Sequence, residues 1–155
     1  MNLIKAVRSV YTKYATFSGR ASRSEFWWYQ LFYVVITGVP IAYISDAMDS
    51  FWSLVNLLPS LAVACRRLHD TDRSGWWQVL PIAAVPIFIA AFALNRVLLE
   101  FNLDELFGSP LIWIGVVVGL GLYVLLIVWW AMPGTPGPNR FGEDPIGRMD
   151  ADVFS

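Results

Sequence analysis

The sequence predicts an all-α fold: a four-transmembrane-helix bundle preceded by an N-terminal amphipathic interfacial helix. Three observations predict it, namely four long apolar stretches, basic residues gathered on one side of them, and tryptophans at their ends. Of the 155 residues, 57% are hydrophobic and only 15% are charged, and the mean hydropathy is +0.54. Soluble domains carry about 25% charged residues. The composition is therefore typical of a membrane protein.

The first element, residues 1–18, is predicted to be an amphipathic helix on the cytoplasmic membrane surface. Apolar residues recur along it at spacings of three and four, at Leu3, Val7, Val10, Tyr14 and Phe17. This spacing gives a helix one apolar face. The other face carries lysine and arginine, which suit an anionic leaflet. The alternative is that this helix packs against other cytoplasmic segments.

The membrane domain is predicted over residues 19–145, with spans at about 26–44, 47–68, 76–94 and 111–132. A helix needs about 20 apolar residues to cross roughly 30 Å of hydrocarbon. The second span is the weakest, because it contains Asn56 and Pro59 and ends in two arginines. Its alternative is a re-entrant segment that returns to the side it came from. Residues 146–155 are predicted to form a cytoplasmic tail.

The distribution of basic residues decides between these two alternatives. With four spans and a cytoplasmic N-terminus, ten of the eleven Lys and Arg residues lie in cytoplasmic segments, and only Arg96 lies outside. This asymmetry agrees with the positive-inside rule. A re-entrant second segment would instead place Arg66, Arg67 and Arg73 outside. The sequence therefore predicts a multi-pass protein of the cytoplasmic (inner) membrane with both termini in the cytoplasm.

The eight tryptophans agree with this topology. Three adjacent pairs fall at the cytoplasmic ends of predicted spans, Trp27 with Trp28, Trp76 with Trp77, and Trp129 with Trp130. The remaining two, Trp52 and Trp113, fall near the outer ends. Indole rings favour the headgroup layer, where the ring stays in an apolar environment while its N–H donates a hydrogen bond.

Three polar motifs fall on the predicted cytoplasmic face, at residues 19–28, 66–77 and 133–145. In the first motif, Ser22 and Glu25 fit a capping box at a helix start. In the second, Asp72 and Ser74 are predicted to cap the third span. The Pro and Gly residues of the third motif end the fourth span. We expect this last segment to fold back onto the other two motifs.

Where the motifs meet, we expect a cluster of cationic and polar side chains that binds an anion or a partner. Its predicted members are Arg20, Arg23, Arg66, Arg67, His69, Asp70, Arg73, Asn139 and Arg140. Arginine binds phosphate through a planar fork of donors, and basic pockets between helices bind anionic lipid headgroups. The alternative is an Arg–carboxylate lattice that only holds the loops together.

The strings GRASRSEFWW, RRLHDTDRSGWW and PGTPGPNRFGEDP occur in this order around the four spans. Together they resemble the bacterial inner-membrane family catalogued as domain of unknown function 805. The resemblance covers about residues 15–145. It implies a location in the bacterial cytoplasmic membrane, and it supplies no activity.

The function that the sequence favours is a non-enzymatic membrane module of unknown biochemical activity. Its expected partners are membrane lipids, mainly anionic ones, or a membrane protein or second copy of the chain, with no nucleic acid. One cysteine, Cys65, and one histidine, His69, do not make a metal site, and no cofactor is expected.

Two other classes of function are weaker. A transporter or channel component usually holds ionisable residues inside its spans, whereas these spans contain none between their ends. A membrane-embedded enzyme acting on a lipid phosphate is the weakest alternative, because the sequence contains no nucleophile elbow, Walker loop or HExxH motif. His69 and Asp70 are adjacent on a predicted helix and point in different directions, so Asp70 is poorly placed to orient the imidazole.

Overall fold

The computed structural model describes residues 1–42, 44–81 and 110–147. Within these ranges every regular element is a helix, and the one β-type contact is an isolated bridge between Asn139 and Gly142. The predicted all-α class is therefore confirmed.

The chain divides into two compact units. The first joins Met1–Gly75 to Trp129–Ser155, and the second is Trp76–Val128. The first unit therefore contains all three polar motifs except for the Trp76–Trp77 pair.

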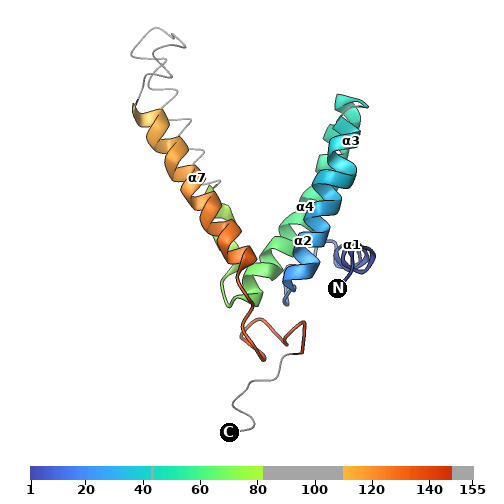
Figure 1. The fold of residues 1–155 in the computed structure, drawn as a ribbon, viewed down its shortest axis with the longest axis vertical. Coiled ribbons are helices and arrows are strands. Elements are labelled where there is room, and N and C mark those ends of the chain that lie inside the picture. Colours follow the sequence, from blue (N-terminus) through green and yellow to red (C-terminus); the bar gives the residue numbers. More distant parts are fainter. Residues whose placement is uncertain (43, 82–109, 148–155) are drawn as a thin grey trace. The chain divides into compact units, whose positions relative to one another are not determined.

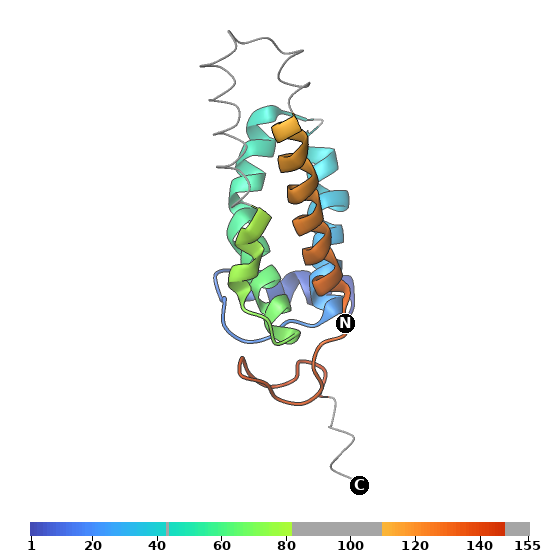
Figure 2. The same cartoon turned by 90° about the vertical axis from the view of Figure 1, so that its left-hand side faces the viewer.

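The first unit is built on a helical hairpin (Figures 1 and 2). One arm runs through α2 (Arg23–Leu31), the π-helical segment η1 (Phe32–Gly38) and α3 (Val39–Ala42), and the other arm is α4 (Asp46–Asp70). These arms correspond to the first two predicted spans. We call the end of the hairpin at which α2 begins and α4 ends the polar end.

Helix α1 (Leu3–Thr12) lies across the hairpin near the polar end (Figure 2). Its Ala6 and Val10 are fully buried, and Val10 belongs to the same apolar core as Phe26 of α2. Burial also raises the pKa of the Tyr11 phenol, so this hydroxyl stays protonated and can donate a hydrogen bond. One face of α1 is thus seated on protein, while its basic side chains are exposed.

Pro59 lies inside α4 without ending the helix. Proline has no N–H, so the carbonyl of Val55, four residues earlier, loses its helical donor. The hydroxyl of Tyr14 donates to this carbonyl instead. The side-chain oxygen of Asn56 accepts a hydrogen bond from Tyr11 at 2.6 Å. The Val55 carbonyl and the Asn56 side chain, both inside the second predicted span, therefore have hydrogen-bond partners in the N-terminal segment.

Two helices of the described residues are long and apolar enough to cross a membrane, Asp46–Asp70 and Trp113–Ala131. The second of these belongs to α7 (Pro110–Ala131), whose large apolar side chains are mostly exposed. Such exposure is what a lipid-facing helix requires.

Part of the predicted topology lies outside the described residues. Of the third predicted span, 76–94, only the residues up to 81 are described, beginning with the short 3-10 helix η2 (Gly75–Val79). The end of the predicted tail, from 148 onward, is also outside the described residues. The four-span bundle therefore stays a prediction.

Candidate functional site

The three polar motifs meet at the polar end of the hairpin. The backbone N–H of Ala21 donates to the Arg66 carbonyl at 2.9 Å, which joins the first motif to the second. The N–H of Thr135 donates to the Asp70 carbonyl at 2.8 Å, which joins the third motif to the second. The structure thus confirms that the segment after α7 folds back onto the other motifs.

Arg20, Arg67 and Asp70 form a buried group that we call the Arg–Asp cluster. Nη2 and Nε of Arg20 lie 2.9 and 3.0 Å from Asp70 Oδ1, and Arg67 Nη1 pairs with Asp70 Oδ2. All three side chains are at most 1% exposed. Two guanidinium groups therefore share one carboxylate with almost no access to water.

The remaining donors of the Arg–Asp cluster bind backbone carbonyls of the chain at and after the end of α7. Arg20 donates to Gly137 O at 2.6 Å and to Thr135 O at 2.5 Å. Arg67 donates to Trp130 O at 2.9 Å and also to Met132 O. The last carbonyls of a helix have no partner within it, and cations near that end are favoured by the helix dipole. The cluster therefore fastens the end of α7 to α4.

Gly134 allows this close approach. A Cβ atom at this position would lie 2.0 Å from Asp70 Oδ2, so any side chain would displace the carboxylate. Sequence reasoning missed both Gly134 and Thr135 as members of the site. The Pro/Gly density of the third motif predicted turns there, but a single sequence does not show what each turn residue touches.

Arg66 and Glu25 form a second buried ion pair beside the Arg–Asp cluster. Arg66 Nη1 lies 2.9 Å from Glu25 Oε1, and the Ser9 hydroxyl of α1 donates to the same oxygen at 3.0 Å. Within the part of the chain that the structure describes, Nε and Nη2 of Arg66 have no hydrogen-bond partner. The Ser22 hydroxyl accepts from Glu25 N at 3.2 Å, as an N-cap does, whereas the Glu25 carboxylate binds Arg66 and Ser9.

His69 is enclosed by all three motifs. Its Nδ1 lies 3.0 Å from the carbonyl of Gly19, and its Nε2 lies 3.5 Å from Cys65 Sγ. A neutral ring that donates from Nδ1 accepts at Nε2, which suits the thiol. The ring stacks on Phe141 with centroids 3.9 Å apart, and Asn139 donates to the His69 carbonyl at 2.9 Å. His69 is thus held by protein groups, and Asp70 is not among those that orient its ring.

The second motif ends α4 with a Schellman turn. Asp72 has a φ of 56°, and the N–H groups of Asp72 and Arg73 donate to the carbonyls of His69 and Leu68 at 3.0 Å each. Asp72 was predicted to cap the third span, and the structure instead places it two residues after the end of α4, directly after the C-cap Thr71. Ser74, predicted with it, is half-buried just before η2.

Of two other predicted site residues in this region, Arg140 is exposed and Arg73 is half-buried. The side chain of Arg140 pairs with Asp72 at 3.1 Å, and the two side chains are 62% and 48% exposed. The guanidinium of Arg73 lies over the ring of Trp129, 4.8 Å from its centroid. The pair of Arg140 and Asp72 joins the third motif to the second at the surface.

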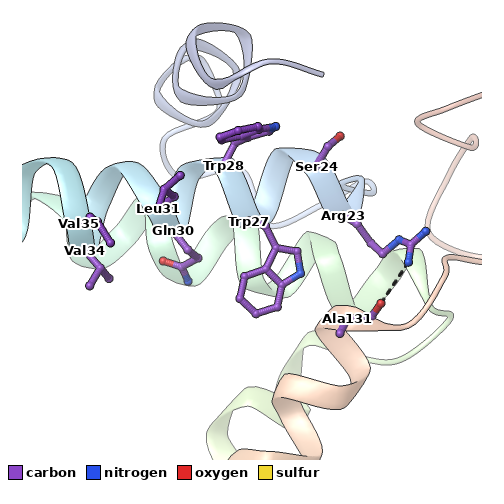
Figure 3. A pocket seen from close by; sticks show the side chains of 9 residues that line it. All are labelled: Arg23, Ser24, Trp27, Trp28, Gln30, Leu31, Val34, Val35 and Ala131. Atoms are coloured by element: carbon purple, nitrogen blue, oxygen red, sulfur yellow. Dashed lines mark hydrogen bonds between the residues drawn. The ribbon is translucent and has the colours of Figure 1, made fainter.

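Arg23 lies apart from the buried groups, at an open groove of about 730 Å³ along α2 (Figure 3). The groove is mainly apolar and is lined by Arg23, Ser24, Trp27, Trp28, Gln30, Leu31, Val34, Val35 and Ala131. Arg23 is exposed, and it donates to the carbonyl of Ala131 at 3.4 Å. Of the predicted cationic residues, this one combines an exposed guanidinium with an adjoining hollow.

The sequence was compared with known proteins. The family described as Protein of unknown function (DUF805) matches residues 14–143. Inner membrane protein YhaI of Escherichia coli (strain K12) is 33% identical over 147 residues, covering 88% of this chain and 92% of the relative. Inner membrane protein YhaH of the same strain is 31% identical over 146 residues, with the same coverage. Uncharacterized protein YiiR of that strain is 31% identical over 134 residues, covering 83% and 85%. No solved structure matches this chain.

Proposed function

We propose that this chain, which belongs to the family Protein of unknown function (DUF805), is a non-enzymatic inner-membrane module whose cytoplasmic face binds anionic phospholipid headgroups. Two relatives that are at least 31% identical are named inner membrane proteins, which supports the location. The proposed topology is multi-pass with both termini in the cytoplasm, because that orientation places ten of eleven basic residues inside.

The buried arginines act as a scaffold in this proposal. Arg20 and Arg67 are occupied by Asp70 and by backbone carbonyls, so neither offers its donors to a ligand. Removing one partner of a buried ion pair costs far more stability than removing one partner of an exposed pair. The scaffold therefore fixes the N-terminal segment, the end of α4 and the chain after α7 in one arrangement.

The observation that carries the proposal is a surface of unneutralised cations beside this scaffold. Lys5, Arg8 and Lys13 of the N-terminal segment and Arg23 of α2 are all exposed. No Asp or Glu occurs before Glu25, and among the described residues none of these four cations forms an ion pair with a carboxylate. Each basic side chain near an anionic leaflet contributes about 1 kcal/mol of attraction.

Native mass spectrometry of the detergent-purified protein tests the proposal. Phosphatidylglycerol and phosphatidylcholine with identical acyl chains are added at equal concentration, and the bound fraction of each is measured. We expect phosphatidylglycerol to be retained in preference. The triple variant K5Q/R8Q/K13Q should weaken this preference. The control is Arg140→Gln, which removes an exposed cation that already has a carboxylate partner. Equal retention of the two lipids by the unaltered protein would refute headgroup binding.

A purely structural role is the second candidate function. It is favoured by the closed pairing of Arg20, Arg67 and Asp70, which needs no ligand to satisfy it. In that case the module is a membrane scaffold, and the experiment above gives no preference for the anionic lipid.

A further inference from the structure

We infer that the groove along α2 is a binding site for one anionic phospholipid, with its phosphate at Arg23 and one acyl chain lying over Trp27, Leu31 and Val34. This inference rests on the proposed function and gives it a location. Three observations carry it: the order of side chains along the groove, the charge of Arg23, and the apolar surface that the groove leaves uncovered.

The side chains of the groove follow the order of chemical groups in a phospholipid. Arg23, Trp27 and Gln30 are spaced by four and three residues, so they form one stripe on α2, and Val34 follows in the π-helical segment η1. Figure 3 shows Trp27 and Gln30 of α2 and Val34 of η1 projecting to the same side of this arm of the hairpin. At 1.5 Å per residue of α-helix, the stripe rises about 6 Å from the cation to the indole and roughly 5 Å more to the amide of Gln30.

These distances suit the parts of a lipid. The cation at the polar end of the groove matches a phosphate, and the guanidinium offers a fork of donors for it. The amide of Gln30 makes no hydrogen bond within the described part of the chain, so its N–H₂ is available to an ester carbonyl. Beyond it, the groove is lined only by apolar side chains such as Val34 and Val35.

The charge of Arg23 distinguishes this site from the buried clusters. Arg20, Arg66 and Arg67 each pair with Glu25 or Asp70. Arg23 pairs with no carboxylate among the described residues, and its one hydrogen bond, to Ala131 O, is long at 3.4 Å. An anion placed there gains a charge-assisted hydrogen bond without breaking an existing ion pair.

Apolar surface beside this cation is uncovered. Trp27, Leu31, Val34 and Val35 are each at least 40% exposed. If residues 82–94 of the same chain covered the groove, they would bury its apolar side chains. These residues include no polar or charged side chain that could pair with Arg23 or Gln30. Burying a cation that has no carboxylate partner, together with an amide that has no hydrogen bond, is costly. A phospholipid satisfies both kinds of surface.

Native mass spectrometry with phosphatidylglycerol as the probe tests the site. Arg23→Gln removes the cation, and Val34→Trp fills the groove. The matched controls are Arg140→Gln, an exposed cation away from the groove, and Ile36→Trp, an exposed apolar residue that does not line it. Thermal unfolding in the same detergent checks that every variant is folded.

We expect Arg23→Gln to reduce phosphatidylglycerol retention about tenfold, as loss of a hydrogen bond to a charged group predicts. Val34→Trp should reduce retention of the same lipid, and both controls should leave it unchanged. If the anionic preference persists in both groove variants, the lipid binds elsewhere; the inference is then wrong while the proposed function stands. If the unaltered protein shows no anionic preference, both fail.

A cross-linking experiment tests whether a protein segment, and not a lipid, occupies the groove. Val34→Cys is paired with single cysteines placed in 82–94, and is also oxidised alone to detect a second copy. We expect no disulfide in native membranes, since lipid fills the groove. Efficient disulfide formation within the chain would show that its own helix covers the groove, and a disulfide-linked dimer would show that a second copy does. Either result would overturn the inference.

Discussion

Neutralising Asp70 removes the one carboxylate that two buried guanidinium groups share. In Asp70→Asn the side chain keeps its size, and its amide oxygen still accepts a hydrogen bond. The negative charge between Arg20 and Arg67 is lost, although neither cation can reach water, since all three side chains are at most 1% exposed. The substitution therefore tests burial of charge rather than packing.

The expected loss of stability follows from that burial. Removing one partner of a buried ion pair costs about 3–5 kcal/mol, because the other partner stays buried and uncompensated. This corresponds to an increase of about 150- to 5,000-fold in the unfolding equilibrium constant. By contrast, the exposed pair of Arg140 and Asp72 contributes at most about 1 kcal/mol, so Arg140→Gln is the control.

The assay is SDS titration of the protein in mild detergent, followed by tryptophan fluorescence. Trp130 packs against Phe26 with ring centroids 5.0 Å apart, so the contact between the last turn of α7 and α2 contributes to the signal of the eight tryptophans. We expect a large shift of the Asp70→Asn midpoint and a small shift for Arg140→Gln. Adding Arg20→Gln to Asp70→Asn should recover part of the loss, because one unpaired charge is then removed. Equal midpoints for the two single variants would show that the carboxylate is solvated and that the cluster is not buried.

Two further predictions concern close contacts of α4. Tyr14→Phe should lower the free energy of unfolding by about 1–3 kcal/mol, because the Val55 carbonyl is left without a donor. In a Pro59→Ala background this loss should be smaller, because the alanine N–H can donate to the same carbonyl. Additive effects of the two substitutions in the SDS titration would contradict this coupling. Gly75→Ala should lower the thermal midpoint, since a Cβ there would lie 2.0 Å from Cys65 Sγ. Cys65→Ala should partly rescue it, and an unchanged midpoint in Gly75→Ala alone would disprove the contact.

Much of the local structure was predictable from residue patterns. The spacing of Leu3, Val7 and Val10 predicted the amphipathic helix that appears as α1, although α1 ends at Thr12 and not at the predicted residue 18. Ser22 was recognised as an N-cap because only short polar side chains accept from the first free N–H groups of a helix. Arg67 and Asp70 are three residues apart, a spacing at which side chains on a helix can meet, and the structure contains this pair. Each of these features depends on residues within a few positions of one another.

The partners of the buried charges were not predictable in the same way. Arg20 was expected to be free for a ligand, yet it binds Asp70, 50 residues away, and the carbonyl of Gly137, 117 residues away. Arg66 was grouped with the same site and instead pairs with Glu25, which sequence reasoning used for a capping box. One sequence shows which charges exist, but not which of them meet.

The sequence by itself therefore determined the helical class, the family and the three motifs that gather on one side of the apolar stretches. Hydropathy, charge asymmetry and helix-end signals are obtained from the residues of each segment alone, so they can be evaluated without knowing the fold. Only the tertiary structure decided that Arg20 and Arg67 are enclosed while Arg23 is open beside a groove. The physical reason is that desolvation depends on every segment packed around a charge, and here those segments are the N-terminal part of the chain, α4, and the residues at and after the end of α7.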